Sequence, residues 1–454
     1  MATVQNARGT RDLLPAQMHG RLHVIGIIRE AFASFGFEPL ETPAFERIDT
    51  LMGKYGEEGE KLIFRILERG EGGREGKADL ALRYDLTVPL ARVIAQNPAI
   101  PMPFKRYQVQ PVWRADRPQK GRFREFYQCD ADIVGIDSRL ADAECLAVAH
   151  EALSRLGFAD FQIKVNHRKL LSAICAAAGA ADRESEVLVA IDKLDKIGRD
   201  GVSKELADRA FPAEVIERLW TMLAEPGDLD AVEAAVGESA RAPAAELREV
   251  FAHVRSLVGD TSPLEELAAL GRPPGAGRVV FDATLARGLG YYTGPVFEAV
   301  ILEGGVGSVS GGGRYDGLVG MFSGRQVPAV GVSLGLERLL VVMEERGMLP
   351  TSGTRTKVLV TRFSPETDVA ALRVAAQLRA EGIETETWLG APGSLGKQFK
   401  YAGGRGIPLA VVIGPEELEA GAVSLKDLRS GHQSRVATEL LHGTICAALD
   451  CRSA

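Results

Sequence analysis

The sequence predicts an α+β protein with more than one domain, and three stretches of different character lead to that prediction. Residues 80–135 combine strand-forming runs with turn residues. Residues 180–270 are dominated by Ala, Glu, Leu and Arg at helical spacing. From residue 356 onward, short apolar runs alternate with helical segments, which is typical of strands and helices packed in layers. A chain of 454 residues is also long for a single hydrophobic core.

The first predicted element is a helix that ends at Gly36, a residue type favoured at helix C-termini. The segment Phe37–Pro43 follows it and is expected to form an extended strand closed by proline. The helix is expected to bury one apolar face, formed by residues at spacings of three and four: Leu22, Ile25, Ile28, Phe32 and Phe35.

Two β-rich runs, Arg106–Trp113 and Phe123–Val134, predict a hairpin connected by the polar loop Ala115–Gly121. The chain carries a net charge of −7, yet the stretch from Lys105 to Arg124 holds seven basic residues and one acid, Asp116. The cluster is either a solvated loop with chance clustering or a site for a polyanion such as ATP or a tRNA end. The basic residues are Lys105, Arg106, Arg114, Arg117, Lys120, Arg122 and Arg124.

A helical insertion is expected to divide the first domain, with helices over Val215–Leu223 and Ala244–Leu257. A Gly- and Pro-rich breaker at 271–277 ends it, and strand-like residues resume at Arg278. The predicted boundaries are 1–178 and 273–346 for the first domain, 179–272 for the insertion, 347–355 for a linker and 356–454 for the last domain.

The last domain is predicted to be an α/β unit with a mostly parallel or mixed sheet. Ser364, Pro365 and Glu366 form a cap with proline at the first helical position. The expected strands are Lys357–Thr361, Ile383–Leu389 and Ile407–Gly414, and the expected helices run to Glu381 and over Leu395–Gly404.

Composition indicates a globular protein of the cytoplasm. Hydrophobic residues make up 46% and charged residues 25% of the chain. No apolar run reaches the roughly 18–20 residues that cross a bilayer, and the N-terminus lacks the apolar core of a secretory signal. The five cysteines show no paired framework, so reduced thiols are expected. His19 and His23 lie four apart, but no cysteine or third histidine is near, so no zinc site is expected.

Two patterns are candidates for chemistry. In the first, Trp113–Arg117 and Gly121–Phe126 place arginines on adjacent strands, where guanidinium groups can bind one phosphate chain bidentately, and Phe126 can stack on adenine. In the second, Gly331–Leu340 alternates small and apolar residues before Glu337 and Arg338. Small residues allow a ligand close to the backbone, although strand–helix packing alone explains this second pattern equally well.

Together these patterns resemble motifs 2 and 3 of the class II aminoacyl-tRNA synthetases, and Gly36–Pro43 resembles motif 1. Three further segments resemble the histidyl-tRNA synthetase family: Gly9–Asp12, Arg287–Gly294 and Gly312–Gly317. The resemblance extends over nearly the whole chain. It implies an antiparallel catalytic sheet flanked by helices, a helical insertion, a C-terminal α/β anticodon-binding domain and a homodimer.

The resemblance also implies the activity. Histidine and ATP form histidyl-adenylate and pyrophosphate, and the histidyl group then passes to the 3′ end of tRNA(His). Mg²⁺ is expected to arrive with ATP, and no protein metal site is expected. Arg287 and Arg114 match catalytic positions, and Arg114 is expected to hold the α-phosphate. The remaining phosphates and the adenine are expected to be bound by Arg122, Arg124, Phe126 and Arg338, and Gln119 matches a tRNA acceptor-end position.

The histidine pocket is implied in the same way. Asp85, Thr87 and Gln128 match positions that bind the ammonium of L-histidine. Asp132 and Tyr292 match positions that face the imidazole, where a carboxylate and a phenol can read one donor and one acceptor. The remaining members of the histidine-binding set are Arg287, Tyr291 and Tyr315. For Tyr291 and Tyr315, a role as core aromatics with satisfied hydroxyls is the alternative.

Two positions depart from the family pattern. Gly290 stands where the family usually has aspartate, which removes a carboxylate near the substrate, and Asp116 stands where glutamate is common. One rival function is a non-catalytic regulatory subunit of ATP phosphoribosyltransferase, whose members lack the anticodon domain and lose the arginines. Another is a plain RNA-binding module, which would leave the histidine pocket without a purpose.

Overall fold

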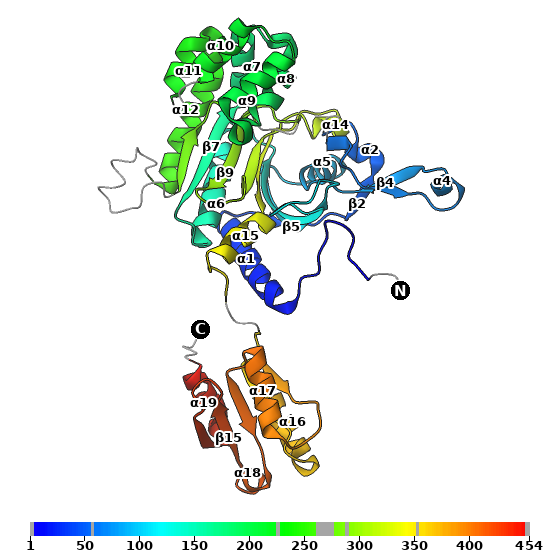
Figure 1. The fold of residues 1–454 in the computed structure, drawn as a ribbon, viewed down its shortest axis with the longest axis vertical. Coiled ribbons are helices and arrows are strands. Elements are labelled where there is room, and N and C mark those ends of the chain that lie inside the picture. The colour runs from blue at the N-terminus through cyan, green and yellow to red at the C-terminus, as the bar shows by residue number, and fades with distance from the viewer. Residues whose placement is uncertain are drawn as a thin grey trace. The chain divides into compact units, whose positions relative to one another are not determined.

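The computed structural model describes residues 4–55, 59–223, 228–259, 277–286, 290–350 and 354–449. The chain divides into two compact units, and Figure 1 shows the elements of each. The first unit comprises Met1–Asp12 and His23–Leu349, and the second comprises Leu13–Leu22 and Pro350–Ala454. Among the residues in these described ranges, no helix is long and apolar enough to span a membrane.

The first unit is built on an eight-stranded sheet in the order β1-β5-β6-β11-β10-β9-β7-β8. Neighbours from β5 through β7 pair antiparallel, and only the two edge pairs, β1 with β5 and β7 with β8, are parallel. The predicted antiparallel sheet is therefore confirmed. The strands are β1 (Glu38–Pro39), β5 (Phe104–Trp113), β6 (Glu125–Val134), β7 (Phe161–His167), β8 (Arg278–Phe281), β9 (Pro295–Ile301), β10 (Ser310–Arg314) and β11 (Ala329–Gly335).

One face of this sheet forms the main hydrophobic core. Successive side chains of a strand alternate between its two faces, and Cys129, Ala131 and Ile133 of β6 are buried on the core face. The same core takes in residues of helices α1 (Pro15–Ser34), α6 (Arg139–Arg155) and α15 (Leu336–Glu345). The other face of β6 carries polar side chains, which leaves that face of the sheet for a binding site.

Two details near the N-terminus differ from prediction. Leu22 is 56% exposed, and the buried face of α1 is formed by Val24, Ile25, Ile28, Ala31 and Phe32. The expected strand Phe37–Pro43 is reduced to β1, because proline has no N–H for the ladder. The predicted helix end is confirmed: α1 stops at Ser34, and Gly36 adopts a positive φ of 76°.

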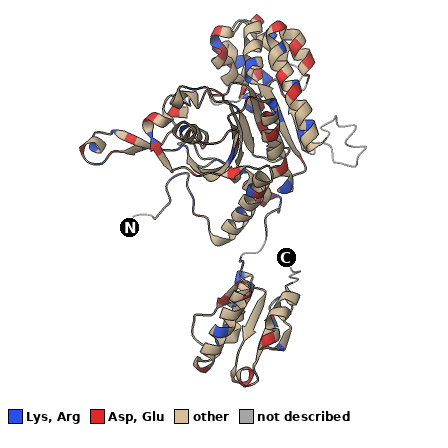
Figure 2. Ribbon diagram, turned by 180° about the vertical axis from the view of Figure 1, so that it is seen from behind, with Lys and Arg blue, Asp and Glu red and all other residues tan. Residues whose placement is uncertain are grey.

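The predicted helical insertion is present, and its helices lie together in Figure 1. Its apolar faces, including Val187, Leu219 and Leu247, belong to the same core as the sheet, so the insertion packs as part of the first unit. Figure 2 shows basic and acidic residues interspersed on these helices. They are η1 (Ala181–Arg183), α8 (Glu184–Ile191), α9 (Leu194–Asp208), α10 (Ala213–Leu223), α11 (Leu229–Val236) and α12 (Glu238–Val258), and they follow α7 (Arg168–Ala178), which lies before the predicted boundary.

A smaller three-stranded sheet, in the order β2-β4-β3, precedes the β5–β6 hairpin. It leads into α5 (Thr87–Gln96), whose first residues belong to the predicted histidine set. The remaining elements of this unit are β2 (Phe45–Arg47), α2 (Ile48–Leu51), β3 (Arg65–Leu67), α4 (Glu71–Arg74), β4 (Ala78–Leu82) and α14 (Gly320–Ser323).

The second unit contains a five-stranded mixed sheet in the order β13-β12-β14-β15-β16. The first three strands in this order pair parallel and the last two antiparallel, which confirms the mixed sheet. Ser364 forms the predicted capping arrangement. The elements are β12 (Val358–Val360), η2 (Pro365–Thr367), α16 (Asp368–Ala380), β13 (Thr385–Thr387), α17 (Leu395–Arg405), β14 (Leu409–Val412), α18 (Pro415–Glu419), β15 (Ala422–Asp427), β16 (Gln433–Ala437), η3 (Thr438–Leu440) and α19 (Leu441–Ala448).

Candidate active site

The candidate site lies on the polar face of the large sheet, across β5, β6 and β11. Residues directly opposite each other in paired strands share a face. On β6 the residues of this face are Gln128, Asp130 and Asp132. Their partners are Gln110, Gln108 and Arg106 on β5, and Gly335, Ser333 and Gly331 on β11. Charged and amide groups on two strands are thus bordered by very small residues on the third.

The glycines of this face make room for larger neighbours. A Cβ built on Gly331 would overlap Oδ1 of Asp132, and one built on Gly313 of β10 would lie 3.0 Å from the ring of Tyr292. These glycines therefore let an acidic side chain and a tyrosine ring lie directly over the sheet. Close approach explains both glycine-rich segments of the sequence.

Asp132 anchors one end of the acidic pocket. The Tyr315 hydroxyl donates a hydrogen bond of 2.5 Å to its Oδ1, and the Arg106 guanidinium forms an ion pair of 2.8 Å with its Oδ2. Burial raises the pKa of Asp132, and Arg106 opposes that shift. Burial also raises the pKa of the Tyr315 hydroxyl, so the phenol remains a donor.

Asp85 anchors the other end. Its Oδ1 accepts hydrogen bonds from the Tyr55 hydroxyl at 3.1 Å and from the backbone N–H of Val88 at 3.0 Å. Its Oδ2 accepts one from the Tyr291 hydroxyl at 3.4 Å, and Thr87 contacts that same hydroxyl. Burial raises the pKa of Asp85.

Three tyrosine rings connect the two carboxylates. The ring of Tyr291 packs edge-on against Tyr292 at 5.1 Å and against Tyr315 at 5.9 Å between centroids. Tyr291 and Tyr315 belong to the second hydrophobic cluster, and their hydroxyls are bonded to Asp85 and Asp132. They are thus core aromatics with bonded hydroxyls, and their hydroxyls contact two residues of the predicted histidine set.

Gln128 and Asp130 lie between these anchors, and Ser333 joins them. The Gln128 side-chain amide donates to the Ser333 hydroxyl at 2.9 Å, and Ser333 in turn hydrogen bonds to Asp130. Within the described ranges, Oε1 of Gln128 and Oδ1 of Asp130 are buried and have no hydrogen-bond partner. Burial, with a contribution from Asp132, raises the pKa of Asp130 to about 7.

The predicted phosphate arginines lie on the adjoining hairpin. Arg114 donates from Nε to the Tyr84 carbonyl at 3.1 Å, and its guanidinium lies 4.2 Å from the Tyr84 ring centroid and 5.2 Å from that of Phe126. Arg122 makes a bidentate pair with Asp116 at 2.9 and 2.8 Å. Gln119 is exposed in the connecting loop. Arg114 thus lies against the Tyr84 and Phe126 rings, while Arg122 is paired with the Asp116 carboxylate.

The N-terminal segment packs on this hairpin. The backbone N–H of Arg124 donates to the Gly9 carbonyl at 2.8 Å, and Nε of Arg124 donates to the Asp116 carbonyl at 3.1 Å. Gly9 has a φ of 84°, and a Cβ there would lie 2.7 Å from Cγ of Arg124. Arg11 lies 4.0 Å from the Phe123 ring centroid. Only glycine meets both demands at position 9.

Arg338, at the start of α15, borders the hairpin loop from the other side. Its Nη1 donates to the Ser308 carbonyl, and a Cβ built on Gly121 would lie 3.3 Å from its Cγ. Arg287 lies outside the described residues, so its predicted role stays a prediction. A Cβ built on Gly290 would meet nothing within 4 Å among the described residues.

Two family models match the chain: one described as histidyl-tRNA synthetase over residues 9–339, and one described as anticodon binding domain over residues 357–446. The chain belongs to the histidyl-tRNA synthetase family. It is 43% identical to a histidine–tRNA ligase of Cytophaga hutchinsonii, over 96% of this chain and 98% of that one. It is 42% identical to a histidine–tRNA ligase of Gloeobacter violaceus, over 94% and 95%.

Solved structures agree with this assignment. The histidyl-tRNA synthetase from Nostoc sp. PCC 7120 matches with a TM-score of 0.81 and 33% identity, over 99% of this chain and 100% of that one. A Bacillus halodurans structure described as an ATP phosphoribosyltransferase regulatory subunit/histidyl-tRNA synthetase matches with a TM-score of 0.69, over 87% and 94% of the chains. Its identity is 22%, so that likeness shows the fold alone.

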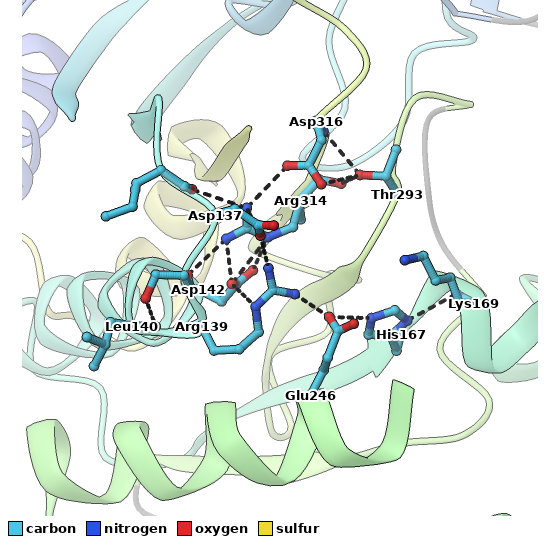
Figure 3. A network of polar contacts seen from close by, with 12 residues as sticks. Asp137, Arg139, Leu140, Asp142, His167, Lys169, Glu246, Thr293, Arg314 and Asp316 are labelled. Atoms are coloured by element: carbon cyan, nitrogen blue, oxygen red, sulfur yellow. Dashed lines mark hydrogen bonds and ion pairs between the residues drawn. The ribbon is translucent and has the colours of Figure 1, made fainter. Parts of the chain in front are cut away.

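An ionic network with a buried centre at Arg314 adjoins the site residue Tyr315 in the sequence, and Figure 3 shows its members. Arg314, 1% exposed, pairs with Asp142 at 2.6 Å and with Asp316 at 3.2 Å. Because Arg314 directly precedes Tyr315, these bonds fix the end of β10 that carries the tyrosine. The network continues outward through Arg139, which also contacts Glu246 of α12.

The outer part of the network ties the insertion to the sheet. His167, at the end of β7, lies 3.3 Å from Glu246, and its other ring nitrogen accepts from the backbone N–H of Lys169 at 3.1 Å (Figure 3). The hydrogen bond from His167 lowers the pKa of Glu246 to about 2. Glu246 is therefore a fixed negative charge between the insertion and the catalytic sheet.

Sequence reasoning missed several residues of this site. Asp130 and Tyr55 were not assigned to it, and Ser333 was noted only as part of the segment Gly331–Leu340. Arg106 was predicted in a basic cluster for a polyanion, whereas the structure buries it in an ion pair with Asp132. For Asp130 a signal existed, because Gln128, Asp130 and Asp132 alternate with apolar residues along one strand, as side chains of one face do. Among the described residues, no group of three or more His, Cys, Asp or Glu side chains is arranged to hold a metal ion.

Proposed function

We propose that this histidyl-tRNA synthetase activates L-histidine with ATP and transfers it to the 3′ end of tRNA(His). A histidine carboxylate oxygen attacks the α-phosphorus of ATP, the bond from that phosphorus to the bridging oxygen breaks, and pyrophosphate leaves. The terminal ribose hydroxyl of tRNA then attacks the carbonyl carbon of histidyl-adenylate, and AMP leaves. The observation that carries this proposal is a buried cluster of acidic side chains that borders an arginine-bearing hairpin on one sheet face.

The charge balance of the pocket suits the ammonium of histidine. Of the three buried carboxylates, Asp130 and Asp132 lie beside one buried guanidinium, Arg106, and Asp85 has the half-buried Arg114 as its nearby cation. A cationic ligand relieves this excess of negative charge, and the raised pKa values of the three acids express the same imbalance. The ammonium is bound by Asp85, Thr87 and Gln128, in keeping with the family motif.

The imidazole is read by Asp132 and Tyr292, with Tyr315 beside them and Tyr291 closing the pocket. Tyr315 and Arg106 hold the Asp132 carboxylate, but each of its oxygens can accept a second hydrogen bond. An apolar analogue of histidine would leave these buried groups unpaired, and that penalty supplies selectivity.

ATP binds along the hairpin. Arg114 holds the α-phosphate, while Arg122, Arg124 and Arg338 bind the other phosphates and the adenine, which stacks on Phe126. Mg²⁺ would enter with ATP and neutralise part of the phosphate charge, beside the arginines that hold the phosphates. Asp116 already accepts hydrogen bonds from Nε and Nη2 of Arg122. To bind a phosphate, Arg122 must therefore release Asp116 or divide its donors between Asp116 and the phosphate.

Catalysis then depends on alignment and charge neutralisation rather than on an enzyme nucleophile. Arg287 stabilises charge where the carboxylate meets the α-phosphate, a role supported by its place in the family segment. Gln119, in the exposed loop between β5 and β6, contacts the acceptor end of tRNA. The regulatory alternative is disfavoured, because the chain keeps the hairpin arginines and matches an anticodon-binding domain.

Pyrophosphate exchange with each amino acid in turn tests the activation step. Exchange is expected with histidine alone, and an Arg287→Ala variant should lose it while keeping the thermal unfolding of the parent protein. Charging of tRNA(His) tests the second step. Absence of exchange with every amino acid would refute the proposed activity.

We further propose a homodimer that works in the cytoplasm. The dimer is supported by the motif 1 segment Gly36–Pro43, and the location by the absence of a membrane-spanning helix among the described residues. Sedimentation should give twice the chain mass of 48.7 kDa at micromolar concentration. A monomer under those conditions would contradict the dimer.

A further inference from the structure

Asp130 is the one residue on the polar face of β6 that neither the family motif nor the proposed function uses. It lies between Gln128 and Asp132 on the same face and is 2% exposed. Its Oδ1 is buried and, among the described residues, accepts no hydrogen bond. A buried carboxylate oxygen without a donor is strongly disfavoured, so such a group commonly marks the place of a ligand.

The orientation of this oxygen is fixed by Ser333. Ser333 lies directly opposite Asp130 in the register of β6 and β11. Its hydroxyl accepts from the Gln128 amide at 2.9 Å and hydrogen bonds to the Asp130 carboxylate. The amide hydrogens of Gln128 are thereby turned toward Ser333, which leaves the Gln128 Oε1 buried and also without a partner in the described part of the chain.

Two neighbouring acceptors without donors define the chemistry of the missing group. Oε1 of Gln128 and Oδ1 of Asp130 come from residues two apart on one strand face, and both need N–H or O–H donors. An ammonium carries several such hydrogens and a positive charge, whereas a neutral imidazole offers only one N–H. The pair therefore fits the ammonium of histidine better than its ring.

The other two acids of the pocket are already engaged. Asp132 accepts a hydrogen bond from Tyr315 at Oδ1, and its Oδ2 has an ion pair with Arg106 but, like Oδ1 of Asp130, accepts no hydrogen bond among the described residues. Asp85 accepts from two tyrosine hydroxyls and a backbone N–H. Asp130 differs because Ser333 satisfies only part of its carboxylate. Burial and the nearby Asp132 raise its pKa while Arg106 lowers it, and Arg106 is itself paired with Asp132, so Asp130 is compensated only in part.

We propose that Asp130 is a further histidine-binding residue, which accepts a hydrogen bond from the substrate ammonium together with Gln128, while Ser333 positions both side chains. The inference rests on the proposed function and adds to it the residue that supplies the counter-charge. Asp85 in addition holds Tyr55, Tyr291 and the start of α5 around the ligand.

Two ligands distinguish this role from a purely structural one. Histidine carries the ammonium, and imidazolepropionate keeps the imidazole and the carboxylate but lacks it. Calorimetric titration of both, near pH 8, compares the full-length parent protein with Asp130→Asn. The variant is expected to bind histidine roughly 10–100-fold more weakly, as for the loss of one charge-assisted hydrogen bond, and to bind imidazolepropionate with unchanged affinity.

A matched control is Asp200→Asn, which makes the same chemical change at an exposed position of α9 and should alter neither affinity. Ser333→Ala tests the positioning role without removing a charge. It should weaken histidine binding roughly 3–10-fold, again with no effect on imidazolepropionate. Because it keeps the carboxylate, this second variant also tests the inference if Asp130→Asn fails to fold.

The outcomes separate the two proposals. If the parent protein binds neither ligand, the proposed function itself fails. If the parent binds histidine and Asp130→Asn binds it equally well, only the role of Asp130 is refuted. An equal loss for both ligands would also refute it, because the residue would then act on the imidazole or on the shape of the pocket.

Discussion

Replacing Asp130 by asparagine should stabilise the ligand-free protein, and the gain should grow with pH. The pKa of this carboxyl is raised from 3.8 to about 7 by burial, so the folded protein keeps a proton that the unfolded chain releases. A group with a raised pKa contributes stability that is fully present below the unfolded pKa and is lost as pH rises through the folded pKa. Asparagine does not titrate, so the variant does not lose that contribution.

The magnitude follows from the shift. One pKa unit corresponds to about 1.4 kcal/mol, so a shift of about three units corresponds to about 4 kcal/mol in total. The parent protein loses this stability only up to the folded pKa of about 7. Raising the pH from about 5 to 8 therefore covers roughly two pH units of the loss, which corresponds to roughly 3 kcal/mol of unfolding free energy. The free energy of unfolding of Asp130→Asn relative to the parent should therefore rise by roughly 3 kcal/mol over that interval.

Urea unfolding at about pH 5 and pH 8 measures this difference. The chain has two compact units, so the signal must report the first alone. A Trp388→Phe background leaves Trp113 and Trp220, both in the first unit, as the fluorescent probes. The reasoning is refuted if the difference in unfolding free energy stays constant with pH, or if the variant is less stable than the parent at the higher pH. The folded protein would then already compensate the charge of the Asp130 carboxylate.

Three further substitutions test the packing of the site. Arg314→Met should lower the free energy of unfolding, measured with urea, by about 3–5 kcal/mol, because it leaves the fully buried Asp142 without its main counter-charge. Combining Arg314→Met with Asp142→Leu should recover most of that loss. Gly331→Ala should raise the KM for histidine at least about tenfold with little change for ATP, since the new methyl group overlaps Asp132; equal effects on both KM values in pyrophosphate exchange would contradict this. Gly290→Ala should leave the melting temperature unchanged in thermal unfolding, because a Cβ there meets nothing within 4 Å.

Much of the fold could be predicted from local patterns. The hairpin of β5 and β6 follows from two β-rich runs around a polar loop, and the helices of the insertion follow from their spacing. The strand after Gly36 was predicted too long, because the run Phe37–Pro43 contains two prolines that cannot donate to a ladder. Leu22 fits the helical period but is exposed, since period alone does not fix how far a buried face extends.

The site was predictable only in part, because its partners are far apart in the sequence. Arg314 pairs with a carboxylate 172 residues away, and nothing local indicates that Asp142 is buried within α6. Asp130 is similar, because alternation along β6 assigns it to the polar face but cannot tell which acid has a counter-charge. That distinction depends on Arg106, Tyr315 and Ser333, which reach the pocket from three other strands or loops.

The acids of the pocket therefore oppose stability until substrate binds, and this leads to a last prediction. Histidine at about a hundred times the Kd of the parent protein stabilises it by about 2.7 kcal/mol, while a variant that binds about a hundredfold more weakly gains only about 0.4 kcal/mol. Near pH 8, histidine should thus reduce the difference in unfolding free energy between Asp130→Asn and the parent protein by about 2 kcal/mol. Imidazolepropionate, added at the same multiple of its own Kd, should leave that difference unchanged. Urea unfolding of the parent protein and the variant with each ligand measures both differences in unfolding free energy. An advantage that histidine does not reduce would mean that Asp130 destabilises the folded protein without contributing to substrate binding.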